Sequence, residues 1–368
     1  MDKFLTYRPH IFIIITIFAT MFYGQFMVSS MIIEAPCKIN LHLAVGAKRP
    51  DGFHDITSVF LSLNLCDTLE IELKAPSLSF VESVEIETDA SELPAELAAP
   101  LEALPPKQNI IYKAAKLFWK TCGALDGSAR PVKITVKKRI PTGAGLGGAS
   151  SDAAATLLAL NTLTGGPLST AVLRDAAAEL GSDVPFFLDG GGAAFVEGRG
   201  EKIRALPTPK LFVVLLNPLF ASATARAFKL LDDFRASTQR LDADSFKEEN
   251  RSKTLSPDPR SPVPRSWLNF SGFQNDFLPA LDALGTDAEK AAYRAMLADL
   301  KAAGAEFASL SGSGSTCFGV FARESDAKAA ALTLGEKWCW VTSVSPRLDC
   351  PHDLPHADSR ILADKSLI

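Results

Sequence analysis

The chain has 368 residues, a hydrophobic share of 47% and a formal net charge of −4 at neutral pH. This length accommodates two domains, and the composition is ordinary for a soluble globular protein. The net charge gives no sign of the basic surface typical of nucleic-acid binding, so no nucleic-acid partner is expected. The six cysteines are scattered without a Cys-x-x-Cys pair, which predicts reduced thiols, a cytoplasmic location and no structural metal.

The first thirty residues differ from the rest. Lys3 and Arg8 precede an apolar run over residues 11–22, which is too short to span a bilayer comfortably and resembles the core of a signal peptide. Met31 stands just before a strand-like segment, so a misassigned start is the first interpretation, ahead of a targeting peptide and, last, a membrane anchor. We expect residues 1–30 to be a leader outside the mature fold, and no stable membrane association.

Residues 32–45 predict a strand with two distinct faces. Ile39 and Leu41 fall on one face because side chains alternate along a strand. Lys38 and Asn40 share the opposite face. A lysine on an exposed edge strand is the simplest interpretation of Lys38 taken alone.

The next segments continue an N-terminal region of mixed strands and helices. A turn at residues 48–52 leads to strands over residues 56–63 and 68–74, with a further candidate at residues 84–88. An amphipathic helix is predicted over residues 109–121.

Residues 141–151 read Pro-Thr-Gly-Ala-Gly-Leu-Gly-Gly-Ala-Ser-Ser and precede a predicted helix over residues 152–161. Glycines allow positive φ and a close approach to a ligand. Ser150, Ser151 and Asp152 are of the types that cap helix N-termini. Because a helix N-terminus offers free N–H groups and a favourable dipole, the segment predicts a phosphate site.

Two other interpretations of this loop are weaker. A plain flexible turn would not need four glycines in six residues. Gly143, Gly145 and Gly148 satisfy the dinucleotide pattern Gly-x-Gly-x-x-Gly, but the preceding strand, residues 132–139, has one polar face, and no acidic residue follows about 20 positions on. No Gly-Lys-Ser/Thr follows either. The remaining interpretation is a phosphate loop without a lysine of its own.

A second helix is predicted over residues 169–180. It is followed at residues 181–187 by Gly-Ser-Asp-Val-Pro-Phe-Phe. Asp183 stands there at a helix-initiating position, and a helix-capping role is its simplest interpretation. Residues 309–315 form a serine–glycine loop whose amides could meet phosphate, or which could be a tight turn between strands.

The second half begins near Leu206. Its predicted order of strands, helices and a loop entering a strand is ferredoxin-like, over residues 211–216, 287–303, 310–322, 325–337 and 338–344. Strands and helices do not alternate strictly, which favours an α+β fold. Residues 236–265 are polar and dotted with proline, which predicts a mobile surface loop.

Together these segments resemble the motifs of the GHMP kinase superfamily, in order and spacing, over about residues 31–345. The matching segments are residues 36–41, 49–54, 108–111, 138–141, 181–187, 197–201, 274–276 and 309–315. The resemblance implies a two-domain fold. Residues 31–206 would form an N-terminal domain like domain 2 of ribosomal protein S5, residues 207–345 a ferredoxin-like C-terminal domain, and residues 346–368 a tail.

The resemblance also implies roles for individual residues. Lys38 and Asp183 match the catalytic pair. Asn40, Phe53 and His54 match acceptor contacts, with Phe53 where relatives often place a tyrosine that stacks on cytosine and His54 at the cytosine edge. The residues implied in ATP binding are Asn109, Lys138, Pro141, Thr142, Gly143, Ala144, Gly145, Leu146, Gly147, Gly148, Ala149, Ser150 and Ser151. Mg²⁺ is implied as well, with ligands that the motifs do not name.

The implied activity is ATP-dependent phosphoryl transfer to the alcohol of a small molecule. The Asp-Gly-Phe-His segment at residues 51–54 favours members that phosphorylate the 2-hydroxyl of a cytidylated methylerythritol in non-mevalonate isoprenoid biosynthesis. A mevalonate or homoserine kinase is the nearest alternative. A catalytically silent nucleotide-binding protein is another, although Lys38 and Asp183 together argue against it. The oligomeric state, monomer or homodimer, stays open.

Overall fold

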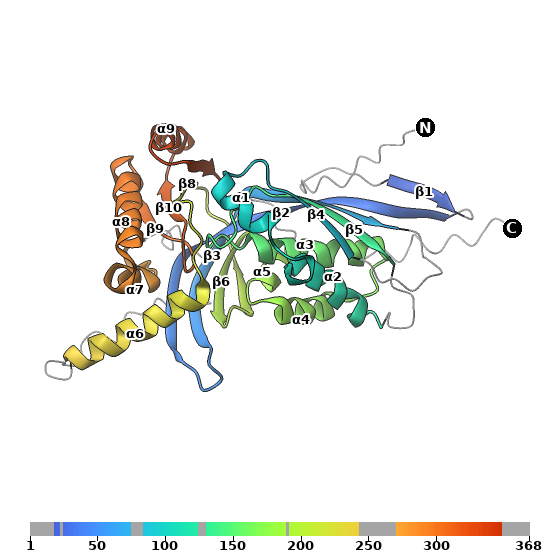
Figure 1. The fold of residues 1–368 in the computed structure, drawn as a ribbon, viewed down its shortest axis with the longest axis horizontal. Coiled ribbons are helices and arrows are strands. Elements are labelled where there is room, and N and C mark those ends of the chain that lie inside the picture. Colours follow the sequence, from blue (N-terminus) through green and yellow to red (C-terminus); the bar gives the residue numbers. More distant parts are fainter. Residues whose placement is uncertain are drawn as a thin grey trace.

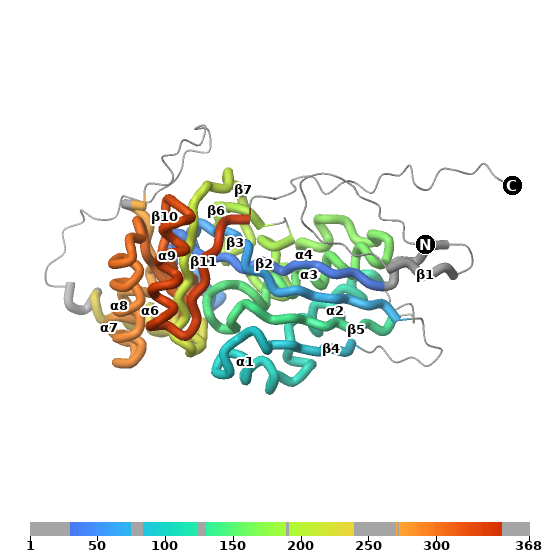
Figure 2. The backbone as a smooth tube through the Cα atoms, turned by 90° about the horizontal axis from the view of Figure 1, so that it is seen from above, coloured from blue at the N-terminus to red at the C-terminus, as the bar shows by residue number. Residues whose placement is uncertain are grey.

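The computed structural model describes residues 18–22, 25–74, 84–123, 130–188, 191–242 and 270–347. Two bodies lie side by side along the long axis of the molecule. The N-terminal one is drawn from blue to green and the C-terminal one from yellow to red (Figure 1). Seen from above, α7, α8 and α9 gather at the end of the molecule far from α2 and α4 (Figure 2).

The N-terminal body is built on a seven-stranded sheet in which β3 pairs with β2, β5 and β6. All pairings are antiparallel except that of β4 with β5. The strands are β1 (Phe18–Phe22), β2 (Gln25–Lys48), β3 (His54–Leu73), β4 (Val84–Asp89), β5 (Val132–Lys137), β6 (Ala193–Gly198) and β7 (Lys202–Leu206).

Helices α2, α3, α4 and α5 cover one face of this sheet (Figure 1). The helices of the N-terminal body are α1 (Ala95–Glu102), α2 (Ile110–Thr121), α3 (Gly148–Leu163), α4 (Thr170–Leu180), α5 (Val184–Leu188) and the 3₁₀ turn η1 (Pro106–Gln108). The Asn109 side chain accepts a hydrogen bond from the Ile111 amide, which explains where α2 begins. Leu69, Phe118 and Leu157 are fully buried between the sheet and these helices.

The C-terminal body has a four-stranded antiparallel sheet in the order β11-β8-β10-β9. Its elements are β8 (Phe212–Asn217), α6 (Thr224–Asp242), η4 (Phe270–Gly272), α7 (Phe277–Leu284), α8 (Asp287–Ala302), β9 (Phe307–Leu310), β10 (Cys317–Phe321), α9 (Glu324–Gly335) and β11 (Trp340–Val344). A capping box between Thr286 and Glu289 starts α8.

The two sheets share a core. Val214 and Leu216 of β8 pack with the C-terminal helices, whereas the alternate residues Val213 and Leu215 pack with apolar side chains of β2 and β3. Burial on both faces explains why β8 is a nearly continuous apolar run. This shared core holds loops from the two halves of the chain against each other.

The α+β class is confirmed, and each predicted helix lies within a few residues of an observed one. One strand prediction was wrong. Residues 56–63 and 68–74 were predicted as two strands but belong to the single strand β3. Opposite two steps of β2, from Pro36 to Lys38, β3 takes four, from Cys66 to Ser62. A bulge accommodates the polar residues that suggested a break.

The prediction of a loop over residues 236–265 was wrong for its first part. Residues 236–242 continue α6, because the apolar side of this helix packs on the C-terminal core through Ala227 and Leu231 and the helix extends beyond it. Residues 243–265 lie outside the described residues.

The N-terminal segment is described in part. Within residues 1–30, β1 pairs with residues 25–30 at the start of β2 as an antiparallel hairpin. An apolar run rich in aromatic and β-branched residues suits a strand as well as a leader. Residues 1–17 and 23–24 lie outside the described residues, as do residues 348–368 of the tail. Processing of the segment and the domain limits stay predictions.

Candidate active site

Lys38 lies on β2 and the residue is almost fully buried, at 3% exposure. Its ammonium group donates a hydrogen bond to Asn40 Oδ1 at 2.7 Å and stands 4.7 Å from the centre of the Phe60 ring. Asn40 is itself fixed, because its Nδ2 donates to Ser58 Oγ at 2.9 Å. Lys38 and Asn40 therefore form a buried, hydrogen-bonded polar site on this face of β2, and Lys38 is not on an exposed edge.

Asp183 meets Lys38 directly. Asp183 Oδ2 lies 3.3 Å from Lys38 Nζ, and the aspartate side chain is 28% exposed whereas that of the lysine is 4% exposed. Asp183 precedes the short helix α5, whose five residues are all buried. The pair therefore combines a buried, fixed ammonium group on Lys38 with a carboxylate on Asp183 that solvent or a ligand can reach.

The glycine-rich loop passes over this pair. Gly143, Gly145 and Gly147 all have positive φ, between 65° and 75°. A Cβ atom at Gly147 would stand 3.1 Å from Lys38 Cε, closer than ordinary contact, and the positive φ of Gly147 also disfavours other residues. Glycine therefore suits the close approach of the loop to the lysine. The Lys38 amide donates to Leu146 O at 2.8 Å.

The helix after the loop starts earlier than predicted. Gly147, in the left-handed region, is the N-cap of α3, and no side chain caps the helix. The prediction that Ser150, Ser151 and Asp152 cap it was wrong, since all three lie inside α3. The first turn still presents free N–H groups beside Lys38. The Ser151 hydroxyl is buried and has no hydrogen-bond partner among the described residues.

The serine–glycine loop from the C-terminal body holds the glycine-rich loop in place. Ser311 Oγ donates to Gly145 O at 2.9 Å, and the Thr316 amide donates to Ala144 O at 3.1 Å. The Ser222 amide, close to the start of α6, donates to Gly143 O at 2.8 Å. Both bodies therefore contribute to one loop cluster around Lys38 and Asp183.

Lys138 lies beneath the loop, with its ammonium group enclosed by two carboxylates. It forms ion pairs with Asp67 and with Asp152 Oδ2, the latter at 2.6 Å, and its side chain is 3% exposed. Asp67 also accepts hydrogen bonds from the amides of Arg139 and Ile140 at 2.6 and 2.9 Å. This buried triad fixes the entry into the loop, so Lys138 acts here as part of the loop's frame.

The two carboxylates of the triad differ in their support. Asp67 accepts three donors, whereas Asp152 Oδ1 has no partner among the described residues. Burial raises the pKa of Asp152 to about 7, against the opposing effect of Lys138. Burial alone would lower the pKa of Lys138, but the charges of Asp152 and Asp67 outweigh it and raise that pKa. Burial therefore favours the protonated form of the Asp152 carboxyl more than that of an ordinary exposed aspartate.

The remaining predicted residues lie further along. Asn109 is committed to capping α2, which packs against α3. Phe53, at the tip of the β2–β3 hairpin, is 50% exposed, and the Arg199 guanidinium lies 4.7 Å from its ring centre. His54 is buried, and its ring stacks on Phe228 with centroids 5.0 Å apart.

Sequence reasoning missed several of these groups. Arg199 lies within a quoted motif and Asp152 directly follows the glycine-rich loop, whereas Asp67 lies outside every quoted motif. No spacing signal marked these residues as partners of Lys138 or Phe53. Among the described residues, no group of three or more His, Cys, Asp or Glu side chains is placed to hold a metal ion. No helix in the described ranges has the length and apolar character of a membrane span.

The comparisons with known proteins agree with this arrangement. Residues 109–191 match the N-terminal domain of GHMP kinases and residues 267–338 match their C-terminal domain. A homoserine kinase from Cytophaga hutchinsonii shares the fold, with a TM-score of 0.56 at 16% identity over 90% of this chain and 98% of that one. The fold is that of a GHMP kinase.

More similar proteins narrow this class. The 4-diphosphocytidyl-2-C-methyl-D-erythritol kinase of Treponema pallidum (strain Nichols) is 35% identical over 318 residues, which are 86% of this chain and 98% of that protein. A crystal structure of 4-(cytidine 5'-diphospho)-2C-methyl-D-erythritol kinase superposes with a TM-score of 0.63 at 27% identity, over 86% of this chain and all of that one. The chain belongs to the 4-diphosphocytidyl-2-C-methyl-D-erythritol kinase family.

Proposed function

We propose that this protein transfers the γ-phosphoryl group of ATP to the 2-hydroxyl of 4-diphosphocytidyl-2-C-methyl-D-erythritol, a step of the methylerythritol phosphate pathway to isoprenoid precursors. The observation that carries the proposal is the contact between Lys38 and Asp183 directly beside Gly147 of the glycine-rich loop. Membership of the family supports the choice of acceptor.

The glycine-rich loop is the proposed phosphate site. Phosphoryl transfer to an alcohol depends mostly on positioning and on charge stabilisation. The left-handed glycines open the backbone, and the first turn of α3 directs N–H groups outward. We assign the ATP phosphates to residues 141–151, with Asn109 and Lys138 supporting the nucleotide site through the start of α2 and the frame of the loop.

Asp183 is the proposed base. Its carboxylate is partly exposed, as a group that must meet the acceptor hydroxyl needs to be. It would accept the proton of the 2-hydroxyl or orient that hydroxyl for in-line attack. Lys38 would keep the carboxylate ionised and stabilise negative charge on the attacking oxygen. Asn40 fixes the lysine by accepting one of its three ammonium hydrogens.

The described residues offer a protein oxygen, the Ser151 hydroxyl, that could bind Mg²⁺. The ion is usually held by substrate phosphates, waters and only one or two protein oxygens, so a dedicated cluster of carboxylates is not needed. The buried Ser151 hydroxyl, which lacks a partner within the described ranges, is the oxygen we assign as its protein ligand. When bound, the ion neutralises charge on the phosphates.

Phe53 and His54 are the proposed base-recognition residues of the acceptor site. The exposed Phe53 ring retains the stacking face of a tyrosine but not its hydroxyl.

The partners we propose are small molecules, with no nucleic acid and no stable membrane association. We propose a cytoplasmic enzyme, in keeping with the net charge of −4 and the free cysteines of the described residues.

A coupled assay of ADP release tests the function. The protein is incubated with ATP, Mg²⁺ and one acceptor at a time: the cytidylated methylerythritol, mevalonate or homoserine. We expect turnover with the first alone. Turnover with mevalonate or homoserine instead would reassign the acceptor, and no ADP release with any of the three would support a silent nucleotide-binding protein.

A further inference from the structure

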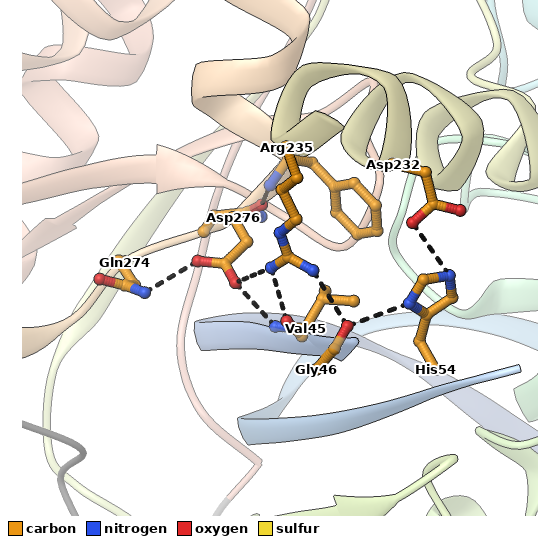
Figure 3. A network of polar contacts seen from close by, with 9 residues as sticks. Val45, Gly46, His54, Asp232, Arg235, Gln274 and Asp276 are labelled. Carbon is orange, nitrogen blue, oxygen red and sulfur yellow. Dashed lines mark hydrogen bonds and ion pairs between the residues drawn. The ribbon is translucent and has the colours of Figure 1, made fainter. Parts of the chain in front are cut away.

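A polar network outside the loop cluster joins the C-terminal body to the β2–β3 hairpin near its tip (Figure 3). The segment around Asp276 runs beside β2: the Leu43 amide donates to Gln274 O at 2.8 Å, and the Asp276 amide donates to Leu43 O at 3.0 Å. Asp276 Oδ2 then accepts from the Val45 amide at 2.8 Å. The Asp276 carboxylate thus adds a third hydrogen bond to β2, next to the two backbone bonds at Leu43.

Arg235 on α6 completes this contact. Its Nη2 donates to Val45 O at 2.6 Å and to Asp276 Oδ2 at 3.1 Å. Its Nη1 donates to Gly46 O at 2.9 Å. One guanidinium therefore holds two consecutive backbone carbonyls and a carboxylate, which its planar fork of donors allows and a lysine could not reproduce.

The same carbonyl connects Arg235 to His54. His54 Nδ1 lies 3.0 Å from Gly46 O. A carbonyl oxygen can only accept, so the hydrogen of this bond belongs to Nδ1. The geometry thereby selects the tautomer of the ring, and stacking on Phe228 fixes its plane.

The other ring nitrogen is held less tightly. His54 Nε2 lies 3.4 Å from Asp232 Oδ1, longer than the ~2.7–3.2 Å of an ordinary N–H···O bond. Asp232 and Arg235 are three residues apart on α6 and share one side of the helix. Helix α6 thus acts on both ring nitrogens of His54. Arg235 holds the Gly46 carbonyl that bonds Nδ1, and Asp232 lies 3.4 Å from Nε2. Nε2 is the ring atom whose partner a ligand can replace.

We propose that Arg235 and Asp276 are positioning residues for the acceptor: by holding the Val45 and Gly46 carbonyls they set the orientation and tautomer of His54, and so the affinity for the acceptor's base. The inference rests on the proposed function, because it assigns the acceptor to His54. It makes acceptor recognition depend on a contact between the two bodies, some distance along the hairpin from Lys38.

Steady-state kinetics of Arg235→Met test this role. Removal of a charged donor pair from a partly buried network should raise the KM for the acceptor by about tenfold. The kcat and the KM for ATP should stay within about twofold of the wild type. Arg235→Lys should resemble Arg235→Met, since a lysine lacks the fork. Asp276→Asn keeps the side-chain shape and should raise the same KM by a smaller factor. It replaces Arg235→Met as the test if that variant does not fold.

Arg294→Met is the matched control. Arg294 pairs with Asp282 at 2.5 Å on the exposed side of α7 and α8, away from the hairpin. This variant should leave both KM values unchanged. A parallel change of kcat and of both KM values in Arg235→Met would mean a merely structural contact and overturn the proposal, as would an unchanged acceptor KM in both Arg235 variants.

Nitrogen-15 NMR of the histidine rings separates this proposal from the proposed function, because it needs no activity. The chain has five histidines, and loss of a signal in His54→Gln assigns His54. We expect the wild type to show a protonated Nδ1 and Arg235→Met to show a mixture of tautomers. A His54 spectrum that is the same in both proteins would overturn the positioning role even if the acceptor assay fails for the wild type.

Discussion

Gly145 and Ser311, from opposite halves of the chain, are in direct backbone contact: a Cβ atom placed on Gly145 would stand 2.0 Å from the carbonyl oxygen of Ser311. Ser311 Oγ also donates to Gly145 O. The glycine-rich loop therefore depends on the serine–glycine loop for its path. Its shape is a property of both bodies together.

Gly145→Ala should consequently impair both stability and nucleotide binding. The positive φ costs an alanine about 1–2 kcal/mol, and the contact with Ser311 forces the two loops apart in addition. We expect a lower urea midpoint of unfolding and an ATP KM raised at least tenfold. Gly165→Ala is the control, since Gly165 also has positive φ but nothing lies within 4 Å of its Cβ position. Equal effects of both variants would refute the contact's role.

Lys38→Met should lower kcat by about 10²–10³, because it removes a preorganised charge beside the position that we propose for the attacking oxygen. The methionine keeps the aliphatic contact with Gly147, so the KM for ATP should change by less than about twofold. Lys74→Met, which breaks an exposed pair with Glu85 at 2.9 Å, should leave kcat unchanged. Wild-type turnover in Lys38→Met would remove the lysine from the mechanism.

Asp152 should make stability fall as pH rises. Its folded-state pKa, about 7, exceeds the ordinary value of 3.8, so between these values the unfolded chain has lost a proton that the folded chain keeps. Unfolding is favoured as pH increases through this window, by on the order of 2 kcal/mol between pH 5 and 8. Asp152→Asn should therefore gain stability relative to the wild type over that range, measured by urea unfolding at both pH values.

Asp282→Asn provides the comparison for that pH series. A hydrogen bond from Arg294 lowers the pKa of Asp282, so its stabilising effect is lost only as pH falls below the ordinary carboxyl range. Its difference from the wild type should be the same at pH 5 and pH 8. A pH-independent difference for Asp152→Asn as well would contradict the assignment of the proton to Asp152.

Phe53→Ala should raise the acceptor KM by about tenfold, in line with the ~1–3 kcal/mol of base stacking on an aromatic ring. Phe53→Tyr keeps the ring and should stay within about twofold of the wild type. The KM for ATP should not change in either. Leu332→Ala, at an apolar residue that is 78% exposed on α9, controls for loss of surface apolar area. Equal acceptor KM values for Phe53→Ala and the wild type would refute stacking.

Much of the fold followed from local pattern. The helices starting after Asn109 and Ser169 carry caps and apolar periodicity that depend only on neighbouring residues. Helix α1 has Pro100 in its interior, so local rules do not predict it. The joining of residues 56–63 and 68–74 into one strand depends on the partner strand β2, whose pairing no local pattern contains.

The site residues that belong to sequence motifs could be predicted. The residues that reach the site only through tertiary packing could not. Lys38 and Asp183, predicted as a pair, lie 3.3 Å apart. The partners of Lys138 are 71 and 14 residues away, and Arg235 contacts the Gly46 carbonyl across 189 residues. Such contacts arise from the packing of the two bodies, and single-sequence reasoning has no access to them.

The most direct test of the central claim is the turnover of Asp183→Asn with ATP and the cytidylated methylerythritol. The asparagine keeps the shape of the side chain but cannot accept the hydroxyl proton. We predict that kcat falls by about 10²–10⁴ while the KM for ATP stays within about twofold, and that Asp175→Asn, at an exposed aspartate of α4, behaves like the wild type. A fall in kcat of less than about tenfold would contradict the assignment of Asp183 as the base.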